Sequence, residues 1–281
     1  MAPSLPLISV VVLAGDDERH VGAALESVSA QDYPATELLI VDGSRDRTGA
    51  IVRAFAQDPR SQARFERVVV LDGAPGSGPE AANQGIRESR GVSVALLNGD
   101  ERLLPRRLTR MSEVCRASAA EIAFSRVEPL HDGSPAAAEI EYVYSVQDNI
   151  EFFPTVGYAL LRHQSALSRG NLFFSRALFD RVGPFAAYEH AHDWDFLLRC
   201  LLVTEPAFVA EPLYGLRLRG HEGFIDRQRQ VAKEAEAILR TYFFYSRTRP
   251  LTNAVAPSPA WGPFFASFVT ASRHGNYLVK P

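Results

Sequence analysis

The sequence predicts an α/β fold with a mostly parallel sheet flanked by helices. Two observations carry this prediction. Short apolar runs rich in β-branched residues recur through the first hundred residues, and such runs are typical of strands buried on both faces. Segments with helical spacing of apolar residues lie between them, and this alternation produces βαβ units with parallel strands and right-handed crossovers.

The elements follow one another in a regular order. The predicted strands are Leu7–Leu13, Glu37–Val41, Arg67–Leu71 and Val92–Leu97. An apolar stripe with a helical period follows the first strand and consists of Val21, Ala24, Leu25 and Val28. A second stripe follows the second strand and consists of Ile51, Val52 and Phe55.

The composition limits the class of protein. The chain has 281 residues, of which 46% are hydrophobic, so it can bury a substantial globular core. Its 30 basic and 33 acidic residues give a formal net charge of -3, which would not attract nucleic acid. The longest apolar stretch, Leu5–Gly15, is too short to span a bilayer. Cys115 and Cys200 lack the spacing of a disulfide framework or a zinc site, so we expect a cytoplasmic protein.

The fourth predicted strand ends at Asn98-Gly99-Asp100-Glu101. Asn-Gly is a strong signal for a hairpin turn, but no second strand follows it. Helical spacing follows instead, at Leu104, Leu108, Met111 and Cys115. We therefore expect a strand that ends at the rim of the sheet and leaves its carboxylates there.

Acidic residues end three of the predicted strands. Asp42 ends the second strand, Asp72 the third and Asp100 the fourth. The carboxyl edge of an open parallel sheet is where such folds bind ligands. We expect a ligand role for Asp42 and Asp100, since converging carboxylates repel one another unless a cation or donor groups neutralise them. For Asp72 the favoured role is to cap a turn or a helix.

Two common nucleotide-binding motifs are missing. The segment LAGDDERH after the first strand has no Gly-rich turn, which excludes the dinucleotide fingerprint. The segment GAPGSGPE, residues 73–80, lacks the Lys-Ser/Thr pair of a phosphate loop, so we expect a flexible loop.

The second half of the chain contains two further helical stripes. One begins directly after Asp193, which therefore either caps that helix or has a chemical role, and consists of Trp194, Leu197, Leu198 and Leu201. The other consists of Val231, Ala235, Ile238 and Tyr242. Residues 131–164 interrupt the pattern, and within them Tyr142 and Tyr144 alternate like one face of a strand that packs in the core.

Four ordered blocks stand between Pro6 and Leu239. They are PLISVVV, ALESVSAQDYPATELLIVDGSRDRT, AANQGIRESRGVSVALLNGDERLLPRRL, and NLFFSRALFDRVGPF followed by HDWDFLLR. Together these blocks resemble glycosyltransferase family 2, the inverting enzymes of the GT-A fold. The resemblance implies a GT-A-type, Rossmann-like sheet. It implies a glycosyltransferase domain over residues 1–245, with a donor half of about 1–110 and an acceptor half of about 111–245. A tail rich in proline and aromatic residues, 246–281, then covers the core, meets a partner or touches a membrane surface.

The resemblance also implies roles for individual residues. Asp193 matches the catalytic base, and Asp100 matches the last acid of the D-x-D motif, which holds Mn²⁺ or Mg²⁺ against the donor's diphosphate. Asp42 matches the acid that receives the nucleobase. The other donor-binding positions are Ser44, Asn83, Asn98 and Gly99. His221 is a second candidate for the metal, and His192 a candidate partner of Asp193. Apart from the resemblance, Glu101 is an alternative metal ligand, because its longer side chain could reach the ion if Asp100 instead caps the next helix.

Several positions depart from the family pattern. Asn98 replaces the first acid of D-x-D, Ala82 replaces an arginine, and His192 replaces the glutamate before the base. The resemblance as a whole implies an inverting transfer of a sugar from a nucleoside diphosphate-sugar to an acceptor hydroxyl, in glycan or polysaccharide assembly. The alternatives are a noncatalytic nucleotide-binding or assembly subunit with the same scaffold, and a nucleotidyltransferase. A peripheral contact with the inner face of a membrane stays open.

Overall fold

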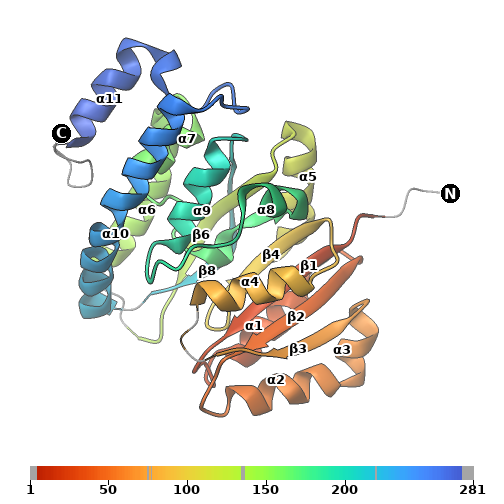
Figure 1. Cartoon of the computed structure of the whole chain (residues 1–281). Coiled ribbons are helices and arrows are strands. Elements are labelled where there is room, and N and C mark those ends of the chain that lie inside the picture. The colour runs from red at the N-terminus through yellow and green to blue at the C-terminus, as the bar shows by residue number, and fades with distance from the viewer. Residues whose placement is uncertain (1–4, 75, 77, 134–136, 219, 274–281) are drawn as a thin grey trace.

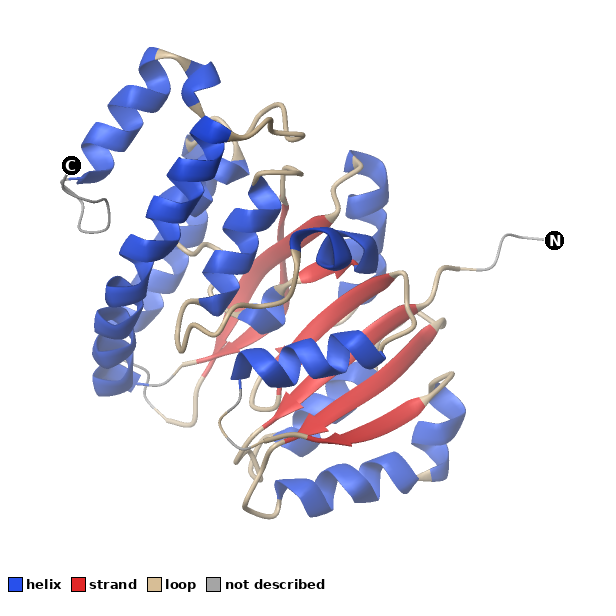
Figure 2. Cartoon of the chain, in the orientation of Figure 1, coloured by secondary structure: helices blue, strands red, loops and turns tan. Residues whose placement is uncertain are grey.

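The sheet organises the whole molecule. The computed structural model describes residues 5–74, 76, 78–133, 137–218 and 220–273, with the side chains of 220–228 and 272–273 left out. Within this part, eight strands form one sheet in the order β3-β2-β1-β4-β7-β6-β8-β5 (Figure 2). The strands are β1 (Ile8–Ala14), β2 (Thr36–Asp42), β3 (Val68–Asp72), β4 (Ser93–Asn98), β5 (Arg102–Leu103), β6 (Ile122–Leu130), β7 (Phe173–Ser175) and β8 (Ala207–Arg217).

The first four strands are parallel, as the sequence predicts. Strand β1 pairs with β2 and with β4, and β2 pairs with β3. The second half is mixed, because β7 runs antiparallel to both β4 and β6, whereas β6 and β8 are parallel. Short β5 pairs antiparallel with β8 directly after Asp100, so the chain at Asn98-Gly99 does not return as a hairpin onto β4.

Helices cover both faces of the sheet. They are α1 (Val21–Ser29), α2 (Thr48–Gln57), α3 (Pro59–Arg64), α4 (Gly78–Glu88), α5 (Arg107–Ser118), α6 (Ala137–Asp148), α7 (Val156–Arg162), α8 (Arg176–Val182), α9 (His192–Leu201), α10 (Gly220–Thr248) and α11 (Pro263–Arg273). Figure 1 shows α2 and α3 at the opposite end of the molecule from α10 and α11. Three short 3₁₀ helices span Asn149–Phe152, Arg169–Asn171 and Pro259–Trp261.

Strand β1 divides its side chains between two hydrophobic cores. Val11 and Leu13 face the core beneath α4 and α9, whereas Val10 and Val12 face the core beneath α1 and α5. Successive residues of a strand point to opposite faces, so an all-apolar strand is expected where helices cover both. The predicted stripe of α1 is buried throughout, which confirms that helix.

Two sequence expectations about burial were wrong. Strand β3 is an edge strand and only half-buried, because it pairs with β2 alone. Tyr142 and Tyr144 belong to helix α6 and not to a strand, and Tyr144 is exposed. Alternation over three residues is too short to distinguish a strand from a helix.

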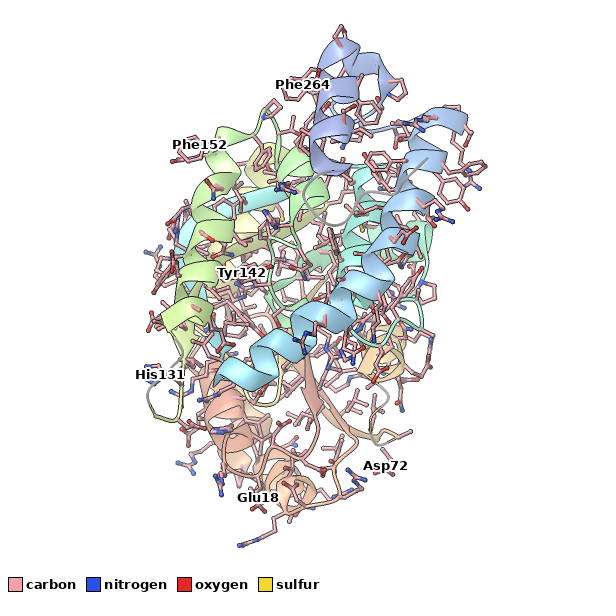
Figure 3. All side chains as sticks on the ribbon, turned by 90° about the vertical axis from the view of Figure 1, so that its left-hand side faces the viewer. Glu18, Asp72, His131, Tyr142, Phe152 and Phe264 are labelled. Atoms are coloured by element: carbon pink, nitrogen blue, oxygen red, sulfur yellow. The ribbon has the colours of Figure 1, made fainter. Side chains whose placement is uncertain are left out.

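The C-terminal segment packs on the body of the protein. Tyr158 of α7 is fully buried and makes edge-on contacts with the rings of Trp261, Phe264 and Phe268. Phe265 lies in the same core as α9. Figure 3 shows Phe264 and Phe152 at this aromatic end of the molecule, far from Glu18 and Asp72. Of the roles considered for the aromatic tail, the structure shows coverage of the core.

Candidate active site

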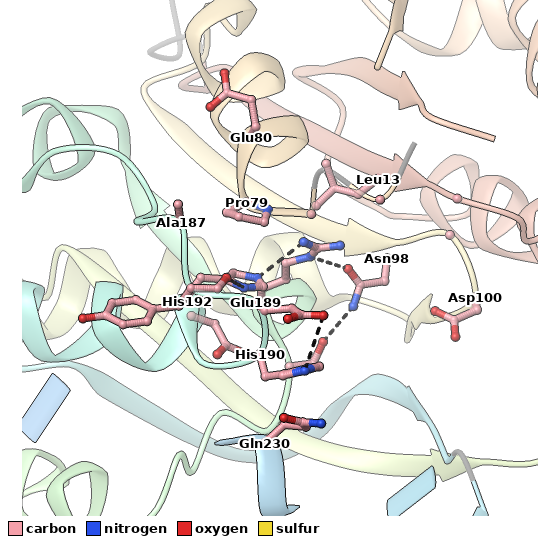
Figure 4. Close-up of a pocket in the computed structure, with 18 of the residues that line it drawn as sticks. Leu13, Pro79, Glu80, Asn98, Asp100, Ala187, Glu189, His190, His192 and Gln230 are labelled. Atoms are coloured by element: carbon pink, nitrogen blue, oxygen red, sulfur yellow. Dashed lines mark hydrogen bonds and ion pairs between the residues drawn. The ribbon is translucent and has the colours of Figure 1, made fainter. Parts of the chain in front are cut away.

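A cavity of about 850 Å³ lies at the carboxyl edge of the sheet (Figure 4). Both halves of the chain contribute to its wall. Among the residues that the structure describes, the cavity is lined by Leu13, Gly15, Asp17, Gly76, Gly78, Pro79, Glu80, Asn98, Gly99, Asp100, Ser168, Arg169, Ala187, Tyr188, Glu189, His190, His192, Asp193 and Gln230. Its position at the ends of β1 and β4 is where an open α/β sheet is expected to bind a ligand.

Asp100 lies beside a second acid that the sequence analysis did not select. Asp17, in the loop after β1, also lines the cavity, and its Oδ2 accepts a hydrogen bond of 2.8 Å from the Gly15 amide. A Cβ at position 99 would lie 2.5 Å from Asp17 Oδ2, so Gly99 leaves the room that this carboxylate needs. Burial, with the nearby charge of Asp100, raises the pKa of Asp17. The available signal was the Asp16-Asp17 pair at the end of a predicted strand.

Asn98 lines the cavity but faces protein groups. Its Oδ1 accepts a hydrogen bond of 2.8 Å from Arg169 Nε. Its Nδ2 donates to Glu101 Oε2 at 2.8 Å and to Ser168 Oγ at 3.1 Å. The amide is thus oriented by its neighbours, with its carbonyl oxygen toward the arginine.

Glu101 turns into the protein interior. It is 4% exposed, and its Oε2 accepts hydrogen bonds from Asn98, Ser168 and the Tyr214 hydroxyl. Burial raises the pKa of Glu101 to about 6. Glu101 is not among the described residues that line the cavity, whereas Asp100 is, so the choice of Asp100 over Glu101 as the metal ligand stays a prediction.

Asp193 lies in the first turn of α9 and is 3% exposed. Its Oδ2 accepts a hydrogen bond of 2.7 Å from Gln164 Nε2, and its Oδ1 accepts one of 2.8 Å from the Trp194 amide. Ala191 occupies the N-cap position of the helix, so Asp193 is not its N-cap. Its carboxylate is thus oriented by Gln164 and by the backbone of its own helix.

His192 precedes Asp193 and is largely buried. Its Nδ1 lies 3.2 Å from the Tyr188 carbonyl oxygen and its Nε2 lies 3.4 Å from Arg169 Nη1. A neutral ring with its proton on Nδ1 satisfies both contacts, because Nε2 then accepts from the guanidinium. The ring also packs edge-on against Phe185, and direct pairing of His192 with Asp193 stays a prediction.

Three predicted donor-binding residues lie outside the described cavity wall. Asp42 is buried at the end of β2, where it accepts from the Ser44 amide at 3.1 Å and pairs with Arg53 at 3.3 Å. Arg53 also forms an ion pair with the exposed carboxylate of Asp72, and the capping role expected for Asp72 stays a prediction. The side-chain amide of Asn83 donates a hydrogen bond to the Phe185 carbonyl oxygen and accepts one from the Phe185 amide.

The described residues do not form a metal site made of protein ligands alone. No group of three or more His, Cys, Asp or Glu side chains is arranged to hold an ion within the described ranges. His221 lies in the first turn of α10, but its side chain falls outside the described residues. Asp100 and Asp17 are thus the carboxylates that the structure brings together at this edge of the cavity.

Acids outnumber bases around the cavity. Five carboxylates line it, those of Asp17, Glu80, Asp100, Glu189 and Asp193. Arg169 is the only arginine or lysine among the lining residues that the structure describes. The described lining of the cavity therefore carries an excess of negative charge.

Comparison with known proteins identifies the family. The sequence pattern of "Glycosyl transferase family 2" matches residues 9–191. Mannosyltransferase PcManGT from Pyrobaculum calidifontis, solved with GDP-Man and Mn²⁺, has the same fold (TM-score 0.61, 17% identity, 97% of this chain and 76% of that one). So does S. aureus TarS solved with UDP-GlcNAc (TM-score 0.57, 17% identity, 94% and 81%). The fold is that of the GT-A glycosyltransferases, and the chain belongs to glycosyl transferase family 2.

Curated relatives are longer than this chain. It is 30% identical over 240 residues to the uncharacterized protein y4gI of Sinorhizobium fredii, covering 82% of this chain but 24% of that protein. It is 36% identical over 125 residues to the succinoglycan biosynthesis protein ExoO of Rhizobium meliloti, covering 44% and 34%. It is 26% identical over 188 residues to glycosyltransferase AglE of Haloferax volcanii, covering 66% and 58%.

A helix both long and apolar enough to cross a bilayer does not occur in the described part of this chain.

Proposed function

We propose that this chain is an inverting, metal-assisted glycosyltransferase that moves a sugar from a nucleoside diphosphate-sugar to an acceptor hydroxyl in glycan or polysaccharide assembly. The observation that carries the proposal is that Asp100 and Asp193, from opposite halves of the chain, line one cavity. The name of ExoO and the UDP-GlcNAc complex of TarS support a nucleotide-sugar donor and a glycan product.

The acids around Asp100 fit a hard divalent cation, Mn²⁺ or Mg²⁺. Such ions take oxygen ligands and are often held by one or two carboxylates, with water and substrate phosphate oxygens completing the shell. Asp100 would supply the principal carboxylate and Asp17 the adjacent one. When bound, the cation would neutralise the diphosphate and stabilise the charge that develops on it. The Mn²⁺ complex of PcManGT supports this choice of ion.

The proposed reaction is a single displacement. The acceptor oxygen bonds to the anomeric carbon while the bond from that carbon to the diphosphate oxygen breaks. The electron pair of the broken bond stays with the diphosphate, and the hydroxyl proton passes to Asp193. An ordinary aspartate is a weak base, with a pKa of about 3.9. Proton transfer that accompanies the departure of the diphosphate does not need a stronger one.

Recognition of the nucleobase is assigned to the end of β2. Asp42 would accept an N–H from the base and Ser44 would lie beside it, as in the family pattern. In the structure Asp42 is paired with Arg53, so binding would require the base to share or replace that ion pair. We propose a supporting role for Asn83, whose amide fixes the Phe185 backbone on the way to α9.

Donor binding tests the proposal directly. Isothermal calorimetry would measure the affinity of uridine, thymidine and guanosine diphosphates with and without Mn²⁺. We expect at least one of them to bind, and to bind more tightly with Mn²⁺. If none of the three binds, the assignment of the donor site is wrong.

Sugar transfer separates an enzyme from a noncatalytic scaffold. Release of nucleoside diphosphate from UDP-glucose, UDP-GlcNAc and GDP-mannose would be measured with a panel of saccharide acceptors. A protein that binds the donor but releases no diphosphate with any acceptor would favour the scaffold alternative. The stereochemistry of the product would then test inversion.

A further inference from the structure

Arg169 occupies the centre of the polar contacts in the cavity. It begins a 3₁₀ turn, and its guanidinium reaches Asn98 Oδ1 on one side (2.8 Å) and His192 Nε2 on the other (3.4 Å). Figure 4 shows these contacts joining Asn98 to His192. The arginine thus connects the end of β4, beside Asp100, with the start of α9, beside Asp193.

The protein leaves room for this guanidinium and fixes its direction. A Cβ at position 78 would lie 2.8 Å from Arg169 Nη1, so the absence of a side chain at Gly78 lets the guanidinium approach the start of α4. The buried Glu101 carboxylate accepts from the Asn98 amide nitrogen, which turns the Asn98 carbonyl oxygen toward Arg169. This also accounts for the loss of an acid at position 98, because a carboxylate there would place one oxygen against Glu101 Oε2.

The charge around Arg169 indicates the kind of group that it meets. It is the only arginine or lysine side chain among the described lining residues, and five carboxylates surround the same cavity. A guanidinium presents several N–H donors in one plane, which matches the oxygens of a phosphate. The place where it lies, between the candidate metal acid and the candidate base, is where the bond to the diphosphate would break.

We propose that Arg169 binds the diphosphate of the donor and stabilises its charge as it leaves, together with the cation held by Asp100. This inference rests on the proposed function. In this site Asn98 orients Arg169 and does not contact the metal. The fixed positive charge of Arg169 would thus neutralise part of the negative charge of the diphosphate, in addition to the cation held by Asp100.

Binding measurements with three probes test the inference. Uridine diphosphate, guanosine diphosphate and inorganic pyrophosphate would be titrated into the wild type and into Arg169→Gln, Arg169→Lys and Arg60→Gln, each with and without Mn²⁺. Arg60 is a matched control, because it is highly exposed and pairs with its neighbour Asp58. Thermal unfolding without ligand would show whether each variant is folded.

For the nucleoside diphosphate that binds, we expect Arg169→Gln to lower the affinity by about 10- to 100-fold, with or without Mn²⁺. This is the range expected for the loss of a charged hydrogen bond. Arg169→Lys should weaken it less, because the charge remains, and Arg60→Gln should bind as the wild type does. Pyrophosphate should show the same order, which assigns the effect to the phosphates and not to the base.

Two results would overturn the inference, and they differ in what else they exclude. If a folded Arg169→Gln binds the nucleoside diphosphate and pyrophosphate as tightly as the wild type, Arg169 only holds the loop before α9, and the proposed donor site stands. If the wild type binds none of the probes, both the inference and the proposed donor site are wrong.

Discussion

Gln164 Nε2 donates a hydrogen bond of 2.7 Å to Asp193 Oδ2, which links the segment after α7 to the first turn of α9. Asp193 is almost completely buried, yet it lines the cavity. Protein groups alone therefore orient its carboxylate, which is what the proposed role of Asp193 as a base needs.

The first prediction concerns Asp193. Asp193→Asn should lower kcat by roughly 100- to 10,000-fold and leave the affinity for the nucleoside diphosphate within about twofold, because a general base acts on the acceptor in the transition state. The control is Asp195→Asn on the same helix, which loses the ion pair with Arg199 but no described contact with the cavity. Turnover of Asp193→Asn near that of the wild type would exclude its role as the base.

The second prediction separates the residues of the Asn98–Glu101 turn. Asp100→Asn should reduce the effect of Mn²⁺ on donor affinity at least tenfold, since a neutral amide holds a hard cation poorly. Glu101→Gln should leave the effect of Mn²⁺ in place and instead lower the free energy of unfolding, because it disturbs a buried acceptor of three hydrogen bonds. Calorimetry over a Mn²⁺ series and chemical denaturation measure the two effects. The reverse pattern would show that Glu101 holds the ion.

The third prediction concerns Asn83. Its amide oxygen accepts from the Phe185 amide at 2.8 Å, and its amide nitrogen donates to the Phe185 carbonyl at 2.9 Å. Asn83→Ala leaves two buried backbone groups without partners and should cost about 2–4 kcal/mol of unfolding free energy. Donor affinity in the folded variant should change less than it does in Asp100→Asn. A large loss of affinity without loss of stability would instead indicate direct contact with the donor.

The fourth prediction concerns the C-terminal aromatic residues. Phe265 is 4% exposed and packs against Phe243 of α10. Phe265→Ala should lower the free energy of unfolding by about 3–5 kcal/mol, as expected for a buried ring. Phe152→Ala is the control, because Phe152 is 76% exposed and its loss should cost about 0.5 kcal/mol or less. Equal stability of the two variants would show that the segment does not belong to the core.

The fifth prediction concerns pH. Burial, with the nearby charge of Arg162, lowers the pKa of His163 to about 4. In the unfolded chain His163 takes up a proton near pH 6.5, whereas in the folded protein its ring stays neutral down to about pH 4. The free energy of unfolding therefore falls as the pH is lowered from about 6.5 to 4. His163→Gln should reduce this loss by on the order of 2 kcal/mol, measured by denaturation at pH 7 and pH 4.5. An unchanged pH dependence would contradict the assignment to His163.

The sequence by itself determined the parallel half of the sheet and the placement of its acids. Four apolar strands alternate with helices whose stripes repeat at a helical period, and both signals are local, so they survive without knowledge of distant contacts. The positions of Asp42, Asp72 and Asp100 at the ends of their strands follow from the same pattern. Asp193 was likewise placed in the first turn of a helix.

Only the tertiary structure decided which polar groups meet. Ser168 and Tyr214 reach Glu101 from segments far apart in the chain and, together with Asn98 of the same turn, hold its carboxylate in the protein interior. Arg169 and Asp17 enter the site, while Asn83 is held by the Phe185 backbone. A local pattern sets which face of an element is apolar, but hydrogen bonds between distant segments depend on how the elements pack. For that reason the sequence located the edge of the site, and the packing of β4, η2 (Arg169–Asn171) and α9 selected its residues.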